Sequence, residues 1–163
     1  MRLAVLSIPL LTLALAGCAA FAPLPDIAAM PHATLTNSHV DVDSDRTDTF
    51  RVLEIDGRSV FDGTDVNIKN VEIDQHNLVA AGRHARITVD ALAFYGNAAR
   101  RLFWDPMHVK GTIDFVPVAD AAYVVRGSVA LEVSSVWIED AATHVVVGNM
   151  VSAPGRGAAA PAQ

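Results

Sequence analysis

The chain has 163 residues, of which 52% are apolar, 18% are charged and 6% are aromatic. This length suits one domain, and this composition excludes a disordered chain, a collagen-like repeat and a disulfide-rich miniprotein. Lys and Arg number 12 while Asp and Glu number 18, which gives a net charge of −6. That charge argues against nucleic acid as a partner, because a nucleic-acid-binding protein needs a concentrated basic face.

The N-terminus, residues 1–17, has the pattern of a secretory signal peptide. One positive charge at Arg2 precedes an apolar stretch from Leu3 to Leu15, and two small residues, Ala16 and Gly17, follow. The apolar stretch is shorter than the roughly 20 residues that a transmembrane helix needs. We therefore expect a signal peptide and not a membrane-spanning anchor.

The end of this segment, Leu15-Ala16-Gly17-Cys18, resembles the lipobox of bacterial lipoproteins. The resemblance implies cleavage before Cys18 and a thioether-linked group that carries two acyl chains, such as palmitate, on its sulfur, with a third possible on the new amine. Cys18 is the only cysteine, so no intramolecular disulfide competes for it. Two or more acyl chains hold a protein stably on a bilayer. Ala19 follows the cysteine, where Asp tends to retain such proteins in the inner membrane, so the resemblance implies an outer-membrane protein facing the periplasm.

The mature chain divides into three parts by composition. Residues 18–33 contain three prolines and read as an extended tether, because proline fixes φ and lacks a backbone donor. Residues 152–163 are rich in Ala, Gly and Pro and are predicted to be a disordered tail. Residues 34–151 are predicted to form the folded domain.

Apolar residues in the folded part recur with a period of two. In His84–Ala91, alternate residues starting at Ala85 are apolar, which predicts a strand with one buried face. Apolar residues also share one parity from Tyr123 to Trp137. This run is too long for one flat strand, so we expect a bend or bulge near Gly127. Helical turns are expected only in Ala91–Leu102. Turn dipeptides at intervals of about 10 residues complete the pattern of an all-β, mostly antiparallel β-sandwich of about seven or eight short strands.

Several hairpin-like segments resemble the small periplasmic β-modules of bacterial lipoproteins, in the style of PEGA modules. That family is mostly of unknown function, so the resemblance implies a location and a fold and transfers no catalytic residue. One departure is that the apolar strand residues after His84 begin one position late, which predicts a histidine facing away from the core or a bulge. The segments are Ile55-Asp56-Gly57-Arg58-Ser59-Val60, Gly82-Arg83-His84, Phe115-Val116-Pro117-Val118 with Tyr123-Val124-Val125, and Val136-Trp137-Ile138-Glu139-Asp140 with Val145-Val146.

One local trio could ligate a metal ion. His39, Asp41 and Asp43 alternate, so a strand would place them on one face. The acidic run 41–48, which includes both aspartates, is not an EF-hand, because Arg46 and Val52 occupy the positions that need Gly and Glu. A looser calcium site built from its carboxylates is an alternative. The favoured interpretation of residues 41–48 is a solvent-exposed acidic loop without a bound ion, and no cofactor is expected.

A possible partner loop contains Arg100, Arg101, Phe103 and Trp104, residue types that are enriched at interfaces. Alternatively, the two aromatic side chains cap the core and the arginines reach past them to solvent. No nucleophile elbow or phosphate-binding glycine loop occurs, so no enzyme is predicted. The sequence thus favours a non-catalytic, membrane-anchored periplasmic lipoprotein that acts as a structural or protein-interaction module of the envelope. A metal- or small-ligand-binding lipoprotein is the alternative.

Overall fold

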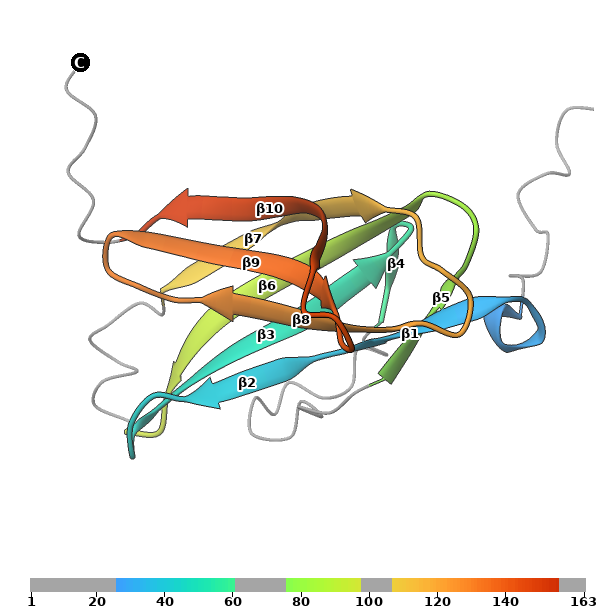
Figure 1. Ribbon diagram of the computed structural model, residues 1–163. Helices are drawn as coiled ribbons and strands as arrows, with labels where there is room; N and C mark the ends of the chain where they lie inside the picture. The colour runs from blue at the N-terminus through green and yellow to red at the C-terminus, as the bar shows by residue number, and fades with distance from the viewer. Residues whose placement is uncertain (1–25, 61–75, 98–106, 156–163) are drawn as a thin grey trace, which may run out of the picture.

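A computed structural model describes residues 26–60, 76–97 and 107–155 of the chain. These residues form ten strands in two mostly antiparallel sheets (Figure 1). The all-β prediction is confirmed, but the expected number of seven or eight strands is wrong. The difference arises because short segments such as β4 (Arg58–Ser59) carry too few residues to show an alternating pattern.

The first sheet has the strand order β10-β9-β8-β1-β5. All its neighbouring strands pair antiparallel except β1 and β8, which are parallel. The strands are β1 (His32–Thr36), β5 (His76–Ala80), β8 (Ala122–Ser128), β9 (Val133–Asp140) and β10 (Val146–Pro154).

The second sheet has the order β2-β3-β6-β7, with β4 paired to β3. The chain passes from the first sheet to the second at Asn37, whose side-chain Oδ1 accepts a hydrogen bond from the backbone amide of Val52 at 2.9 Å. The hydroxyl of Ser38 donates to the carbonyl of Val125 and so ties β2 to β8. The remaining strands are β2 (Ser38–Asp41), β3 (Arg46–Ile55), β6 (Ala85–Tyr95) and β7 (His108–Phe115).

Both sheets contribute side chains to one hydrophobic cluster. On β6 the predicted alternation is confirmed, since Ala85, Ile87 and Val89 are buried while Arg86 is exposed. His84 is exposed and precedes the strand, as its offset from the apolar residues predicts. Such alternation is the expected signature of a strand with one face on a core.

The helical turns expected in Ala91–Leu102 are not present in the described part of that segment. Residues 91–95 instead continue β6, and Ala91, Ala93 and Tyr95 remain on the buried face. Pairing of β6 with both β3 and β7 outweighs the helix preference of its alanines, because tertiary context routinely overrides intrinsic propensity.

The run from Tyr123 to Trp137 is not one bent strand. It is the hairpin β8–β9, with a turn between Ser128 and Val133. The amide of Ala130 in this turn donates to the hydroxyl of the buried Ser134 at 3.2 Å. The buried positions also change parity at the turn: Tyr123 and Val125 are buried in β8, whereas Val136 and Ile138 are buried in β9 and Val133 is exposed.

The folded part extends beyond the expected bounds of 34–151. β1 begins at His32, and β10 continues to Pro154. A short 3-10 helix, η2 (Ile27–Ala29), precedes β1 in the segment expected to be an extended tether. No helix in residues 26–60, 76–97 or 107–155 has the length and apolar character needed to cross a bilayer. The end of the molecule that carries η2 lies opposite the end where β10 finishes (Figure 1).

The edge strands β10 and β7, from different sheets, are joined by one side chain. Asn149 Oδ1 accepts from the amide of Asp114 at 3.1 Å, and its Nδ2 donates to the carbonyl of Thr112 at 3.0 Å. The amide group of Asn149 thus makes the two bonds that a neighbouring strand would make, which protects the edge of β7.

Candidate functional site

Two groups of sequence-predicted residues lie outside the described residues. These are the lipidation site Cys18 and the partner loop with Arg100, Arg101, Phe103 and Trp104. Both therefore remain predictions.

The trio of His39, Asp41 and Asp43 lies at the edge strand β2 and the turn that follows it. Asp41 Oδ1 accepts from the hydroxyl of Thr47 at 2.7 Å, and Asp43 Oδ1 accepts from the amide of Asp45 at 2.7 Å. These carboxylates therefore stabilise the β2–β3 hairpin. Within the described ranges no three His, Cys, Asp or Glu side chains gather into a group that could hold a metal ion.

A polar cluster that the sequence analysis did not single out lies on the solvent side of the first sheet. Its centre is Glu139, whose carboxylate accepts from Arg126 Nε at 3.2 Å and from Trp137 Nε1 at 3.4 Å. His144 Nδ1 lies 3.4 Å from the same carboxylate. We call Arg126, Trp137, Glu139 and His144 the Glu139 cluster.

The electrostatics of the Glu139 cluster favour an ionised carboxylate. Burial raises the pKa of Glu139, but hydrogen bonds from His144, Trp137 and Arg126 outweigh it, so the pKa lies below its ordinary value. A carboxylate held ionised by three donors is a poor general acid, and the cluster is best understood as a structural network. The i, i+2 spacing of Trp137 and Glu139 was a signal in the sequence, because such residues share a strand face.

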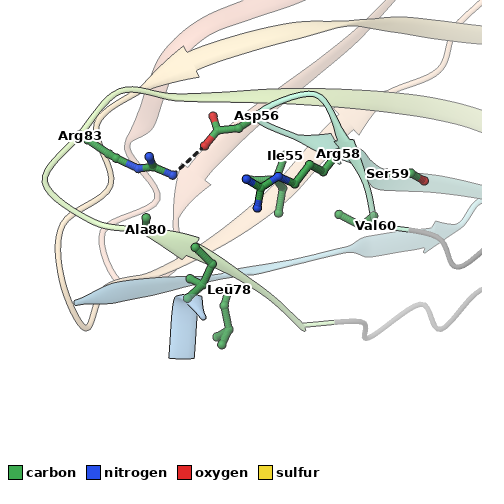
Figure 2. A pocket seen from close by; sticks show the side chains of 9 residues that line it. Ile55, Asp56, Arg58, Ser59, Val60, Leu78, Ala80 and Arg83 are labelled. Atoms are coloured by element: carbon green, nitrogen blue, oxygen red, sulfur yellow. Dashed lines mark hydrogen bonds and ion pairs between the residues drawn. The ribbon is translucent and has the colours of Figure 1, made fainter. Parts of the chain in front are cut away.

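A cavity of about 150 Å³ lies between the β3–β4 hairpin and β5 (Figure 2). Ile27 of η2 also lines it, so it lies near the end of the molecule where the described chain begins. Its apolar lining consists of Ile27, Ile55, Val60, Leu78 and Ala80, and its polar lining consists of Asp56, Arg58, Ser59 and Arg83.

The turn Asp56-Gly57 shapes the cavity. Both residues have positive φ, 52° and 76°, as predicted for this dipeptide between paired strands. Asp56 Oδ2 accepts from Arg83 Nη2 at 3.1 Å, and its Oδ1 accepts from the backbone amide of Arg86 at 3.0 Å. The carboxylate therefore fastens the β3–β4 hairpin to the start of β6.

Three of the segments that carry the resemblance to periplasmic β-modules meet beside this cavity. The hairpin containing Asp56 contacts the turn containing Arg83 through their ion pair, seen in Figure 2. The amide of Gly82 in that turn donates to the carbonyl of Pro117 at 2.9 Å. The segments far apart in sequence thus form one end of the molecule.

Comparison of the chain with protein-family models, with curated proteins and with solved structures gives no match.

Of the large apolar side chains that are exposed in the described residues, five of eleven lie in or beside the β9–β10 hairpin. Val145 is 61% exposed and Met150 is 52% exposed, although both are large apolar residues. Trp137 is half-buried on the solvent side of the same hairpin. The other large apolar side chains exposed in this region are Leu131, Val133 and Val146.

Proposed function

We propose that this chain is a non-catalytic lipoprotein of the cell envelope, anchored through Cys18 and facing the periplasm from the outer membrane. The observation that carries the proposal is Leu15-Ala16-Gly17-Cys18, placed directly after a short apolar stretch. The anchored domain acts as a structural or protein-interaction module, and its partner is another envelope protein.

The module is a β-sandwich in this proposal. The single core cluster built from both sheets supports this assignment. So does the close approach of β8 to β3, where a Cβ added at Gly127 would lie 2.5 Å from Phe50 Cδ1. Sheets packed face to face share their inward side chains in this way.

The β9–β10 hairpin is the part of the described surface that best suits a protein partner. Apolar side chains that are exposed together and rimmed by polar groups are typical of interaction sites. Here Val145 and Val146 border the charged Glu139 cluster.

The anchor is tested by Cys18→Ser in the full chain expressed in a Gram-negative host, with Ala20→Ser as the matched control. The wild-type chain and the control should incorporate a labelled palmitate analogue and sediment with outer membranes. The Cys18→Ser chain should lose the label and retain its signal peptide. If all three behave alike, the anchor proposal is wrong.

The partner surface is tested by photo-crosslinking in intact cells. A crosslinking residue at Val146 or Met150 should give a discrete adduct, and the same residue at the exposed His39, on another sheet, should not. Equal labelling at all three positions, or none at the hairpin, would contradict the assignment of this surface.

A further inference from the structure

We propose that the cavity between β4 and β5 binds a small carboxylate whose apolar body has about six carbon atoms, with the carboxylate paired to Arg58. This inference does not depend on lipidation of Cys18, and a failure of either proposal leaves the other intact.

The first argument is the size and lining of the cavity. Its volume of about 150 Å³ is enough for a group of about six carbon atoms, and the cavity is open to solvent on one side, so a ligand can enter with its charged end outward. The side chains of Ile55, Val60 and Leu78 belong to three different segments and form apolar walls around the space. Ligand sites combine such walls with a few placed polar groups.

The second argument is the charge beside these walls. Of the two guanidinium groups that line the cavity, Arg83 is paired with Asp56 at 3.1 Å. In the described part of the chain no carboxylate pairs with Arg58, and its side chain is exposed. The cavity lining therefore carries two guanidinium groups against one carboxylate, which favours an anion.

The third argument is the position of Arg58 in the strand register. Arg58 pairs with Ile55 across the β3–β4 hairpin, so the two side chains stand on the same face. Figure 2 shows the Arg58 guanidinium lying over Ile55 at the cavity. A ligand whose apolar part contacts Ile55 would thus present its charged end to Arg58, where a charge-assisted, two-bond pairing forms.

The test is a titration of the full chain with hexanoate, followed by NMR of labelled Ile, Leu and Val methyl groups. Shifts are expected at Ile55, Val60 and Leu78 and not at Val125, which lies in the core away from the cavity. Acetate, which lacks the apolar body, should bind at least about tenfold more weakly. No shift at these three residues in 10 mM hexanoate (roughly the weak limit for a small ligand) would overturn the proposal.

The role of Arg58 is tested by Arg58→Gln, with Arg86→Gln as the matched control. Arg86 is exposed, is paired with Asp114 and does not line the cavity. Arg58→Gln should weaken hexanoate binding about tenfold and leave hexan-1-ol binding within about twofold, since one charge-assisted interaction is lost. Equal weakening for both compounds, or for both variants, would overturn the carboxylate assignment.

A second set of titrations distinguishes two kinds of ligand that carry the same carboxylate next to an apolar group. A free carboxylate and the C-terminal leucine of a peptide both offer an apolar group next to a carboxylate. An acetylated tetrapeptide ending in leucine and its C-terminal amide are titrated beside hexanoate. Tighter binding of the peptide acid than of hexanoate, abolished in the amide, would assign the site to chain termini and overturn the small-molecule assignment.

Discussion

At the scale of residues, two ion pairs between adjacent strands of one sheet differ in their surroundings. Arg51 and Asp90 are direct cross-strand neighbours joined by two bonds of 3.0 and 2.6 Å, and their side chains are only 15% and 13% exposed. Arg86 and Asp114 are also direct neighbours, but their side chains are 71% and 53% exposed. Solvent screening should therefore weaken the second pair far more than the first.

Double-mutant cycles with alanine test this difference. The coupling energy of Arg51 and Asp90 should be about 2 kcal/mol, because a bidentate pair is largely withdrawn from water. The coupling energy of Arg86 and Asp114 should be about 0.3 kcal/mol. The measurement is urea unfolding of the four variants in each cycle. Equal coupling in both cycles would show that exposure does not control these interactions.

Asp140 gives a pH-dependent contribution to stability. The amide of Thr143, its hydroxyl and the amide of Ala142 all donate to Asp140 Oδ1, and these bonds hold the pKa of Asp140 below its ordinary value. The carboxylate is ionised above its unfolded-state pKa of about 3.9. Its contribution is thus complete above about pH 4 and is lost as the pH falls through the lower folded-state pKa.

We therefore expect Asp140→Asn to flatten the fall of the unfolding free energy below about pH 4. Urea unfolding of the wild-type chain and the variant between pH 6 and pH 2.5 measures the effect. Asp120→Asn is the control, because the Asp120 carboxylate makes no hydrogen bond among the described residues and asparagine tolerates its φ of 62°. An unchanged pH profile in Asp140→Asn would contradict the role of the turn.

At the scale of elements, the spacing between β8 and β3 depends on the absence of a side chain at Gly127. A Cβ there would lie 2.5 Å from Phe50 Cδ1 and 2.6 Å from the carbonyl oxygen of Ser135. Phe50 is 2% exposed, so its ring has little room to move. The phenyl ring of β3 thus occupies the space that glycine leaves on β8.

Gly127→Ala should lower the unfolding free energy by about 2 kcal/mol, because overpacking displaces a core ring. Gly96→Ala is the control, since its nearest contact would be Asp45 Oδ1 at 3.4 Å, and should change stability by less than about 0.5 kcal/mol. Phe50→Leu should cost less in the Gly127→Ala background than in the wild type. Additive effects of the two substitutions would contradict the proposed contact.

At the scale of the whole molecule, the sequence predicts strands better than it predicts how they meet. The alternation in β6 is visible because one face of the strand is buried along its whole length. The cavity is not visible in this way, since Ile55 and Leu78 come together only through the sheet topology. The same holds for Asn149, whose polar side chain reads as a surface residue but bridges two sheets.

The C-terminal boundary of the domain shows the same limit and can be tested by truncation. Alanine, glycine and proline in residues 152–163 indicate disorder, yet Ser152, Ala153 and Pro154 pair with β9. The hydroxyls of Ser135 and Ser152 lie 2.8 Å apart, and the amide of Gly155 donates to the carbonyl of Glu132 at 2.7 Å. These contacts make the end of β10 part of the sheet.

A chain ending at residue 151 should therefore be less stable than a chain ending at residue 155, by about 2–3 kcal/mol for the lost ladder and side-chain hydrogen bonds. The chain ending at 155 should match the full-length chain, because the composition of the residues beyond it offers little to bury. Thermal and urea unfolding of the three chains compares them. Equal stability of the two truncated chains would place the domain boundary at residue 151, where composition alone predicts it, and would make the last residues of β10 dispensable to the sheet.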